Sequence, residues 1–231
     1  EPLEINFETE KNFLTVCQWG PRKNLDNTIK WFVETFNDDE TVGLVVKTNL
    51  VGDSFVDRTH TEARLKSLLG EFPDRKCKIY LVHGEISPGQ LNYLYTHETM
   101  QGIINLGHGE GFGLPLFEAA TAGLPLITIT WSGQNDFMCT TNKKGKRVPR
   151  IVKVDYDLKP VQKEAVWNGV ITEDSMWAFP KEASFKRALK ECIEKQTHYR
   201  LEALALQKQI KKEFTQEKKY SEFVEFVYGQ S

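Results

Sequence analysis

The chain has 231 residues, 40% hydrophobic and 27% charged, which is enough for one domain with a sizeable core. Its formal net charge of -2 argues against a protein whose main function is to bind nucleic acid, because phosphate contacts need an excess of lysine and arginine. The four cysteines show no CxxC spacing, so we expect a reduced, cytoplasmic chain without a metal site.

Short apolar runs alternate with amphipathic helical patterns along the first 130 residues. Strands are predicted at 13–17, 42–46, 78–82, 102–106 and 124–129, and helices at 25–36, 63–69, 87–95 and 115–122. This alternation predicts an α/β fold with a parallel, doubly wound, Rossmann-like sheet covered on both faces.

The second part of the chain is less regular. Residues 140–150 form a basic, turn-rich segment that we expect to be an exposed insertion. Val152, Val154 and Tyr156 alternate as one further strand, and residues 182–227 are helical in pattern, with a break near 214–216. We therefore predict a single domain over 1–231, with a core at about 12–180 and extra C-terminal helices at about 182–228.

A glycine-rich turn follows the fourth predicted strand. Glycine occupies every second position from Gly107 to Gly113, and Pro115 suits the first position of a helix. A flexible turn that leads into a helix N-terminus is an anion site, because free N–H groups and the helix dipole both point at the ligand. The segment predicts a phosphate or diphosphate ligand.

Two glutamates bracket this turn. Glu110 lies within it, and Glu118 follows eight residues later in the predicted first helical turn. Sugar hydroxyls are donors that such acids accept, so Glu110 is a candidate for hexose hydroxyls and Glu118 for ribose hydroxyls. The competing interpretation is that Glu118 complements the helix dipole and Glu110 is solvated; spacing alone leaves both open.

A basic pair, Arg22 and Lys23, follows the first strand at the same predicted edge of the sheet. Cations at a helix start are unfavourable, which argues against a merely solvated pair. Both residues are candidates for binding a diphosphate and stabilising it as a leaving group. Neither GxxxxGK[ST] nor an early GxGxxG is present, which excludes the usual triphosphatase and NAD loops.

Three segments together resemble a known family. GEGFGLPLFEAATAGLPLI is similar to the signature of glycosyltransferase family 4 and its GT-B fold relatives, in which two glutamates stand eight positions apart. WGPRKNLDNTIKWF resembles the family's first loop and helix, and VHGEISPGQLNYLY resembles the segment before its fourth strand. The resemblance covers roughly residues 12–136 and implies the second, donor-binding Rossmann-like lobe of a GT-B enzyme.

The resemblance also implies roles for individual residues. Arg22 and Lys23, which follow Gly20, would bind and stabilise the diphosphate, and Glu110 would bind the transferred sugar. Glu118 would bind the ribose. Nucleobase contacts would come from the backbone around Ile86, and phosphate or sugar contacts from backbone N–H groups of the residues after Glu110, namely Gly111, Phe112, Gly113 and Leu114.

The implied activity is metal-independent transfer of a hexose, with retention, from a nucleoside diphosphate sugar such as a UDP- or GDP-hexose to a glycan, lipid or protein acceptor. No other cofactor is expected. The resemblance implies that this chain lacks the acceptor-binding N-terminal lobe, so we expect the isolated chain to transfer slowly or not at all. Any peripheral contact with a membrane would be made through that lobe. A binding module without catalysis, or a GT-B relative such as a nucleotide-sugar epimerase, are the alternatives left open.

The sequence also supports expectations for two histidines, two tryptophans and the last predicted helix. His83 and His108 fall in predicted site loops; His83 is expected to be a packing or surface residue, whereas His108 is a candidate donor to phosphate or sugar. Trp167 and Trp177 are expected to pack rather than bind sugar. Exposed apolar side chains are expected on the last helix, at Phe223, Phe226 and Val227.

Overall fold

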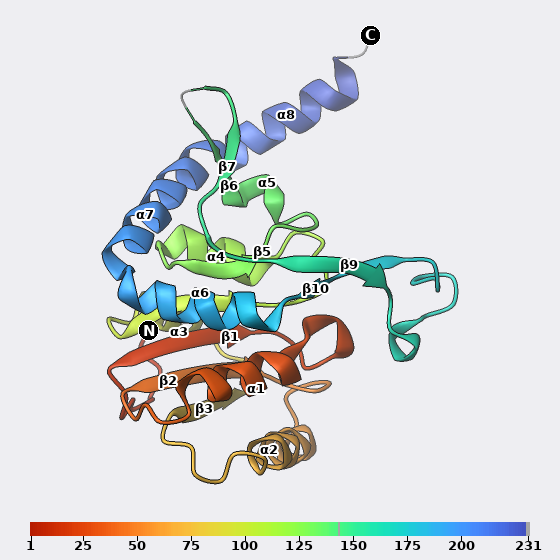
Figure 1. The fold of residues 1–231 in the computed structure, drawn as a ribbon. Coiled ribbons are helices and arrows are strands. Elements are labelled where there is room, and N and C mark those ends of the chain that lie inside the picture. The colour runs from red at the N-terminus through yellow and green to blue at the C-terminus, as the bar shows by residue number, and fades with distance from the viewer. Residues whose placement is uncertain (143, 230–231) are drawn as a thin grey trace.

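The computed structural model describes residues 1–142 and 144–229 and confirms the α/β prediction (Figure 1). Its central sheet has six parallel strands in the order β3-β2-β1-β4-β5-β8. These strands are β1 (Lys11–Val16), β2 (Val42–Thr48), β3 (Lys78–His83), β4 (Met100–Asn105), β5 (Leu126–Ile129) and β8 (Val152–Val154). Neighbouring strands are joined through crossovers, so the sheet is doubly wound as the alternation predicts.

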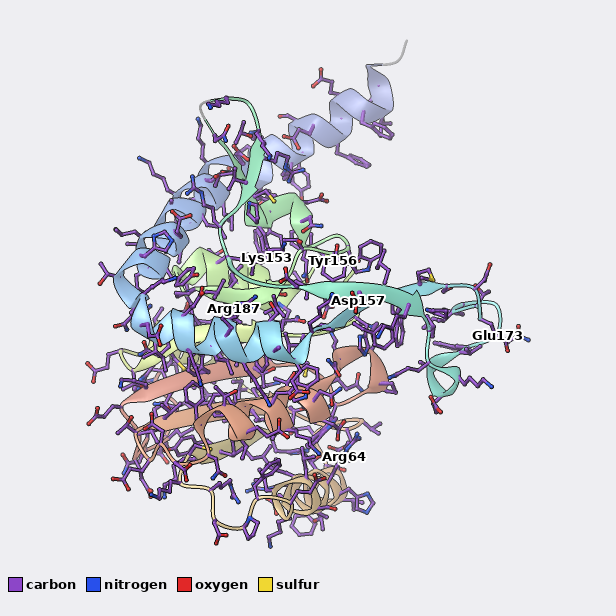
Figure 2. The ribbon with its side chains drawn as sticks, viewed as in Figure 1. Arg64, Lys153, Tyr156, Asp157, Glu173 and Arg187 are labelled. Carbon is purple, nitrogen blue, oxygen red and sulfur yellow. The ribbon has the colours of Figure 1, made fainter. Side chains whose placement is uncertain are left out.

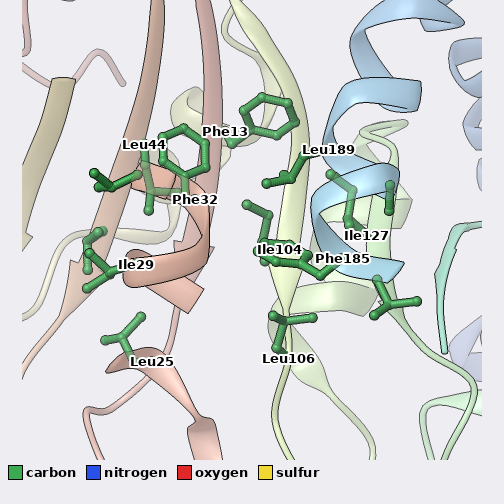
Figure 3. Packing of buried hydrophobic residues seen from close by; sticks show 14 of the residues in the cluster. Phe13, Leu25, Ile29, Phe32, Leu44, Ile104, Leu106, Ile127, Phe185 and Leu189 are labelled. Atoms are coloured by element: carbon green, nitrogen blue, oxygen red, sulfur yellow. The ribbon is translucent and has the colours of Figure 1, made fainter. Parts of the chain in front are cut away.

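Helices cover both faces of the sheet. One face carries α1 (Leu25–Phe36), α2 (Phe55–Leu69) and α6 (Glu182–Glu194); the other carries α3 (Pro88–Thr96), α4 (Leu114–Ala122) and α7 (Gln196–Glu213). Alternate strand residues supply the two cores, since successive side chains point to opposite faces. Phe13 and Leu44 pack with Phe32 and Phe185 on the first face (Figure 3), whereas Leu14 lies in the core of the second.

Two predicted boundaries need correction. The helix predicted at 63–69 begins at Phe55, because the Ser54 side chain accepts a hydrogen bond from the Asp57 N–H and caps it. The buried residues in its first two turns, Asp57 and Thr61, are polar. The sequence of these turns therefore shows no amphipathic pattern from which a helix could be predicted. The strand predicted at 124–129 begins at Leu126, after the turn at Gly123 that ends α4 in a left-handed conformation.

The predicted strand through Val152, Val154 and Tyr156 is wrong in its extent. β8 ends at Val154, and Tyr156 begins β9 (Tyr156–Pro160), which pairs antiparallel with β10 (Met176–Pro180) outside the main sheet. Residues 156–180, called the arm below, include the short helix η2 (Lys163–Ala165). Figures 1 and 2 show the arm extending away from the body, with Glu173 at its far end.

The insertion and the C-terminal segment also have more structure than predicted. Within 140–150, β7 (Arg147–Pro149) pairs with β6 (Cys139–Thr141) just after α5 (Asn135–Met138). The helical pattern of 182–227 divides at Lys195 as well as at the predicted break near 214–216. The last helix is α8 (Gln216–Tyr228), which leaves the body in Figure 1.

Candidate functional site

The site lies where the strand order changes direction. From β1 the chain proceeds to β2 and β3 on one side, whereas β4, β5 and β8 lie on the other. The loops that leave β1 and β4 therefore diverge, and such a switch point at the carboxyl edge is the usual ligand crevice of an open α/β sheet. Here the two loops are tied together by the N–H of His108, which donates to the Arg22 carbonyl at 2.8 Å.

The predicted basic pair and the loop glutamate meet at this point. The Lys23 Nζ lies 2.6 Å from Glu110 Oε1 and 2.8 Å from Oε2, and the Arg22 Nη1 lies 3.0 Å from Oε2. Asn105, at the end of β4, donates to Oε1 at 3.2 Å. Sequence reasoning missed Asn105, because it precedes the glycine loop within the strand. The arrangement brings two cations to one nearly buried carboxylate.

Burial and the neighbouring charges shift the pKa of Glu110 in opposite directions. Its side chain is 7% exposed, and this burial disfavours the ionised form. The hydrogen bond and charge of Lys23, supported by Asn105 and Arg22, outweigh that penalty and hold the Glu110 pKa below its ordinary value. The carboxylate is therefore ionised at neutral pH. The solvated-acid interpretation of Glu110 is wrong, because the side chain is buried and fully partnered.

Backbone contacts fix the position of Glu110. Its carbonyl accepts hydrogen bonds from Ser132 Oγ at 2.7 Å and from the Gly133 N–H at 3.1 Å. The approach is so close that a Cβ on Gly133 would stand 1.8 Å from the Gly111 carbonyl oxygen. The loop after β5 thus clamps the glycine loop, and only glycine fits at position 133.

The glycine loop enters α4 as the sequence predicts. Gly113 is the N-cap in a left-handed conformation (φ +83), with Leu114 and Pro115 opening the helix. The ring of Phe112 packs on Phe117 and Phe137, with centroids 5.1 and 5.2 Å away. This anchor holds the preceding turn beside the positive end of the helix dipole, where an anion is stabilised.

Glu118 lies on α4, apart from Glu110 in the glycine loop. It is the fifth residue of α4 and so belongs to the second helical turn, not the first. Its Oε2 accepts a hydrogen bond from the Tyr95 hydroxyl at 3.0 Å, and both line a groove of about 320 Å³ between α3 and α4. Ile86 lies just before α3 and packs against the second core; Gly20 caps the short helix η1 (Pro21–Lys23).

A second hollow, of about 410 Å³, contains Glu110. Its lining comes from three loops and the arm: Arg22, His108, Gly109, Glu110, Gly111, Trp131, Ser132, Ile171, Met176 and Trp177. The arm residues were missed as site residues, since they follow Glu110 by more than 60 positions and carry no motif. Trp177 is buried as expected, whereas Trp167 is 67% exposed, so the expectation that it packs is wrong.

The two site-loop histidines make structural contacts. His83 Nε2 lies 2.7 Å from Asp57 Oδ1, and Asp57 also accepts the N–H groups of residues 50–52, which fixes the loop after β2. His108 Nδ1 donates to the Ala178 carbonyl at 2.8 Å, so this nitrogen is not available to a ligand. The packing expectation for His83 is confirmed.

Two searches for other features concern the described residues alone. Within 1–142 and 144–229, no three histidine, cysteine or acidic side chains are placed so that they could hold a metal ion. No helix in this part of the chain combines the length and the apolar character needed to cross a membrane.

Comparison with known proteins identifies the fold. No family model and no curated protein matches the sequence. Among solved structures, the chain resembles the C-terminal domain of the glycosyl transferase group 1 family protein LpcC from Francisella tularensis. The TM-score is 0.59 at 12% identity, over 90% of this chain and 88% of that one.

Two larger proteins contain a similar domain. Sucrose-phosphate synthase from Thermosynechococcus elongatus matches with a TM-score of 0.62 at 16% identity, over 96% of this chain and 46% of that one. Anabaena HepE in complex with UDP and glucose matches with a TM-score of 0.63 at 11% identity, over 96% and 49%. The chain thus spans less than half of either protein, and its fold is that of the C-terminal domain of a GT-B glycosyltransferase.

Proposed function

We propose that this chain is the donor-binding domain of a retaining hexosyltransferase that uses a nucleoside diphosphate sugar. The observation that carries the proposal is the convergence of Arg22, Lys23 and Glu110 beside the N-terminus of α4 at the switch point of the sheet. Cations and a helix N-terminus suit a diphosphate, and a buried carboxylate suits sugar hydroxyls. The similar domain in HepE, a protein solved with UDP and glucose, supports this choice of ligand.

Each part of the proposed donor is assigned to a different set of residues. The groove at Glu118 and Tyr95 takes the nucleoside, with Glu118 accepting ribose hydroxyls and the backbone near Ile86 facing the base. The diphosphate lies at the start of α4, against the N–H groups of the glycine loop. Glu110 accepts hydroxyls of the hexose on the far side of the diphosphate.

Charge stabilisation is the proposed catalytic contribution of this domain. When the bond from the sugar to the diphosphate breaks, negative charge grows on the departing oxygen. Once a bound diphosphate has replaced Glu110 as their partner, Lys23 and Arg22 stand close enough to stabilise that charge, as does the dipole of α4. No step in this scheme calls for a metal. Retention and the acceptor depend on a second, acceptor-binding lobe that the proposal assigns to the complete enzyme.

The test is calorimetric titration of the chain with UDP, GDP and ADP. One nucleotide should bind saturably, and Lys23→Ala should weaken it by about tenfold or more, the loss expected for one charge-assisted contact. Lys30→Ala is the matched control, since Lys30 pairs with Glu71 on the exposed side of α1. Absence of binding by all three nucleotides, or equal weakening by both variants, would refute the proposal.

A further inference from the structure

The arm is attached to the glycine loop rather than merely lying near it. The Ala178 N–H donates to the His108 carbonyl at 3.0 Å, and His108 Nδ1 donates back to the Ala178 carbonyl at 2.8 Å. The imidazole also packs between two rings of β10, with centroids 5.3 Å from Trp177 and 4.4 Å from Phe179. The position of β10 is therefore fixed two residues from Glu110.

The other strand of the arm is held by the loop after β5. The Tyr156 hydroxyl donates to the Thr130 carbonyl at 3.2 Å, and its ring lies 6.1 Å from that of Trp131. The turn η2 comes back against η1, which carries Arg22. Both strands of the arm and the short helix η2 thus contact the site loops, so the arm is a wall of the site.

This wall differs in character from the opposite side of the hollow. The loops contribute the polar side chains, among them Arg22, Glu110 and Ser132, together with the ring of Trp131. The arm contributes apolar side chains alone, namely Ile171, Met176 and Trp177. Met176 is 45% exposed although it faces this hollow, so its apolar surface is only partly covered by the protein. An open hollow with charged groups on its loops and apolar side chains on the arm fits an amphipathic ligand.

We infer that the arm is the sugar-selecting wall of the site, in which Met176 and Ile171, backed by Trp177, contact the C–H face of the donor's hexose ring. A pyranose presents hydroxyls at its rim and apolar C–H groups on its faces, which match Glu110 and the arm respectively. The inference rests on the proposed donor function and adds to it the residues that distinguish a sugar conjugate from the bare nucleotide.

The experiment compares two affinities in each variant. Calorimetry measures UDP and UDP-glucose, GDP and GDP-mannose, and ADP and ADP-glucose with the unmodified chain, then the best pair with Ile171→Ala/Met176→Ala. Losing the contact should lower the affinity of the sugar conjugate by about fivefold to tenfold, as expected for the apolar area removed, and leave the diphosphate unchanged. Met176→Leu should retain the preference for the conjugate.

Val170→Ala is the matched control, because Val170 is an exposed apolar residue of the same arm that does not line the hollow. If the double variant behaves like this control, or loses affinity equally for conjugate and diphosphate, the inference about the arm is wrong. It is also wrong if the unmodified chain binds both ligands equally. Failure of the unmodified chain to bind any nucleotide overturns the proposed function itself, and the inference with it.

Discussion

Glu110 joins two positive side chains that would otherwise repel each other at the edge of the sheet. Lys23 contacts both of its carboxylate oxygens and Arg22 contacts one. Without a ligand, this carboxylate offsets one of the two positive charges that a diphosphate would meet. A ligand must therefore compete with Glu110 for the cations, and the sugar hydroxyls then give the carboxylate new partners.

The substitution Glu110→Gln tests this competition. With the counter-ion neutralised, Lys23 and Arg22 attract an added diphosphate more strongly, so we expect UDP or the preferred nucleotide to bind about tenfold tighter at low salt. The amide retains the shape of the side chain. Calorimetric titration measures the change, with Glu71→Gln as the surface control. Weaker nucleotide binding in Glu110→Gln would show that the carboxylate supports the phosphate site instead of competing with it.

Two glycines of the site differ sharply in the space around them. A Cβ on Gly133 would collide with the Gly111 carbonyl, whereas a Cβ on Gly111 would meet nothing within 4 Å. We expect Gly133→Ala to lower the free energy of unfolding by about 1–3 kcal/mol through overpacking, and Gly111→Ala to change it by less than about 0.5 kcal/mol. Urea denaturation measures both; similar losses would contradict the clamp on the glycine loop.

At the scale of elements, His108 connects the loop after β4 to the arm. Burial lowers its pKa below 6.5, and the hydrogen bond to Ala178 offsets this only in part. A group whose pKa is lower in the folded state stabilises the fold above its unfolded pKa and loses that contribution as the pH falls. Protonation of this histidine therefore weakens the packing of the arm.

Melting temperature measured between pH 7.5 and about pH 5 checks this coupling. The unmodified chain should lose stability as the pH falls below 6.5, the ordinary histidine value. His108→Asn retains a side-chain donor but does not titrate, so its melting temperature should fall less steeply over the same range. Parallel curves for the two proteins would show that the pH dependence comes from other groups.

The elements that could be predicted are those with strong local patterns. The glycine loop and Pro115 predicted the start of α4, and Ser87 with Pro88 predicted the start of α3, where a complete capping box forms. The first turns of α2 could not be predicted, because they face solvent with few apolar contacts. The arm could not be predicted either. Its strands pair outside the main sheet, and its position depends on the contacts of β10 with His108, which is distant in the sequence.

At the scale of the whole molecule, the sheet order decides where the site is. The sequence predicted that Arg22, Lys23 and Glu110 share one edge of the sheet, and the structure confirms it. It did not separate Glu118 from Glu110, because the helical turn that carries Glu118 depends on where α4 begins. The two acids therefore line two different hollows, one between α3 and α4 and one between the site loops and the arm.

The last helix is the least integrated part of the described fold. No described side chain of α8 is buried, and Phe223 and Phe226 are exposed as the sequence predicted. Lys219 packs over the Phe214 ring at 4.5 Å. Ending the chain after Phe214 should therefore change the free energy of unfolding by less than about 1 kcal/mol, or roughly 2–4 °C in melting temperature. A larger loss would mean that α8 supports the domain.

The most direct test of the account is a two-dimensional nitrogen–proton NMR spectrum of the chain, recorded while the preferred nucleotide diphosphate is added. We expect the amide signals of Gly111 and Gly113 to shift together and to saturate at the calorimetric affinity, because these N–H groups stand at the proposed phosphate position. Signals of α2 and α8 should stay in place. Saturable shifts confined to another region, with the glycine-loop amides unmoved, would contradict the proposal that this loop binds the donor.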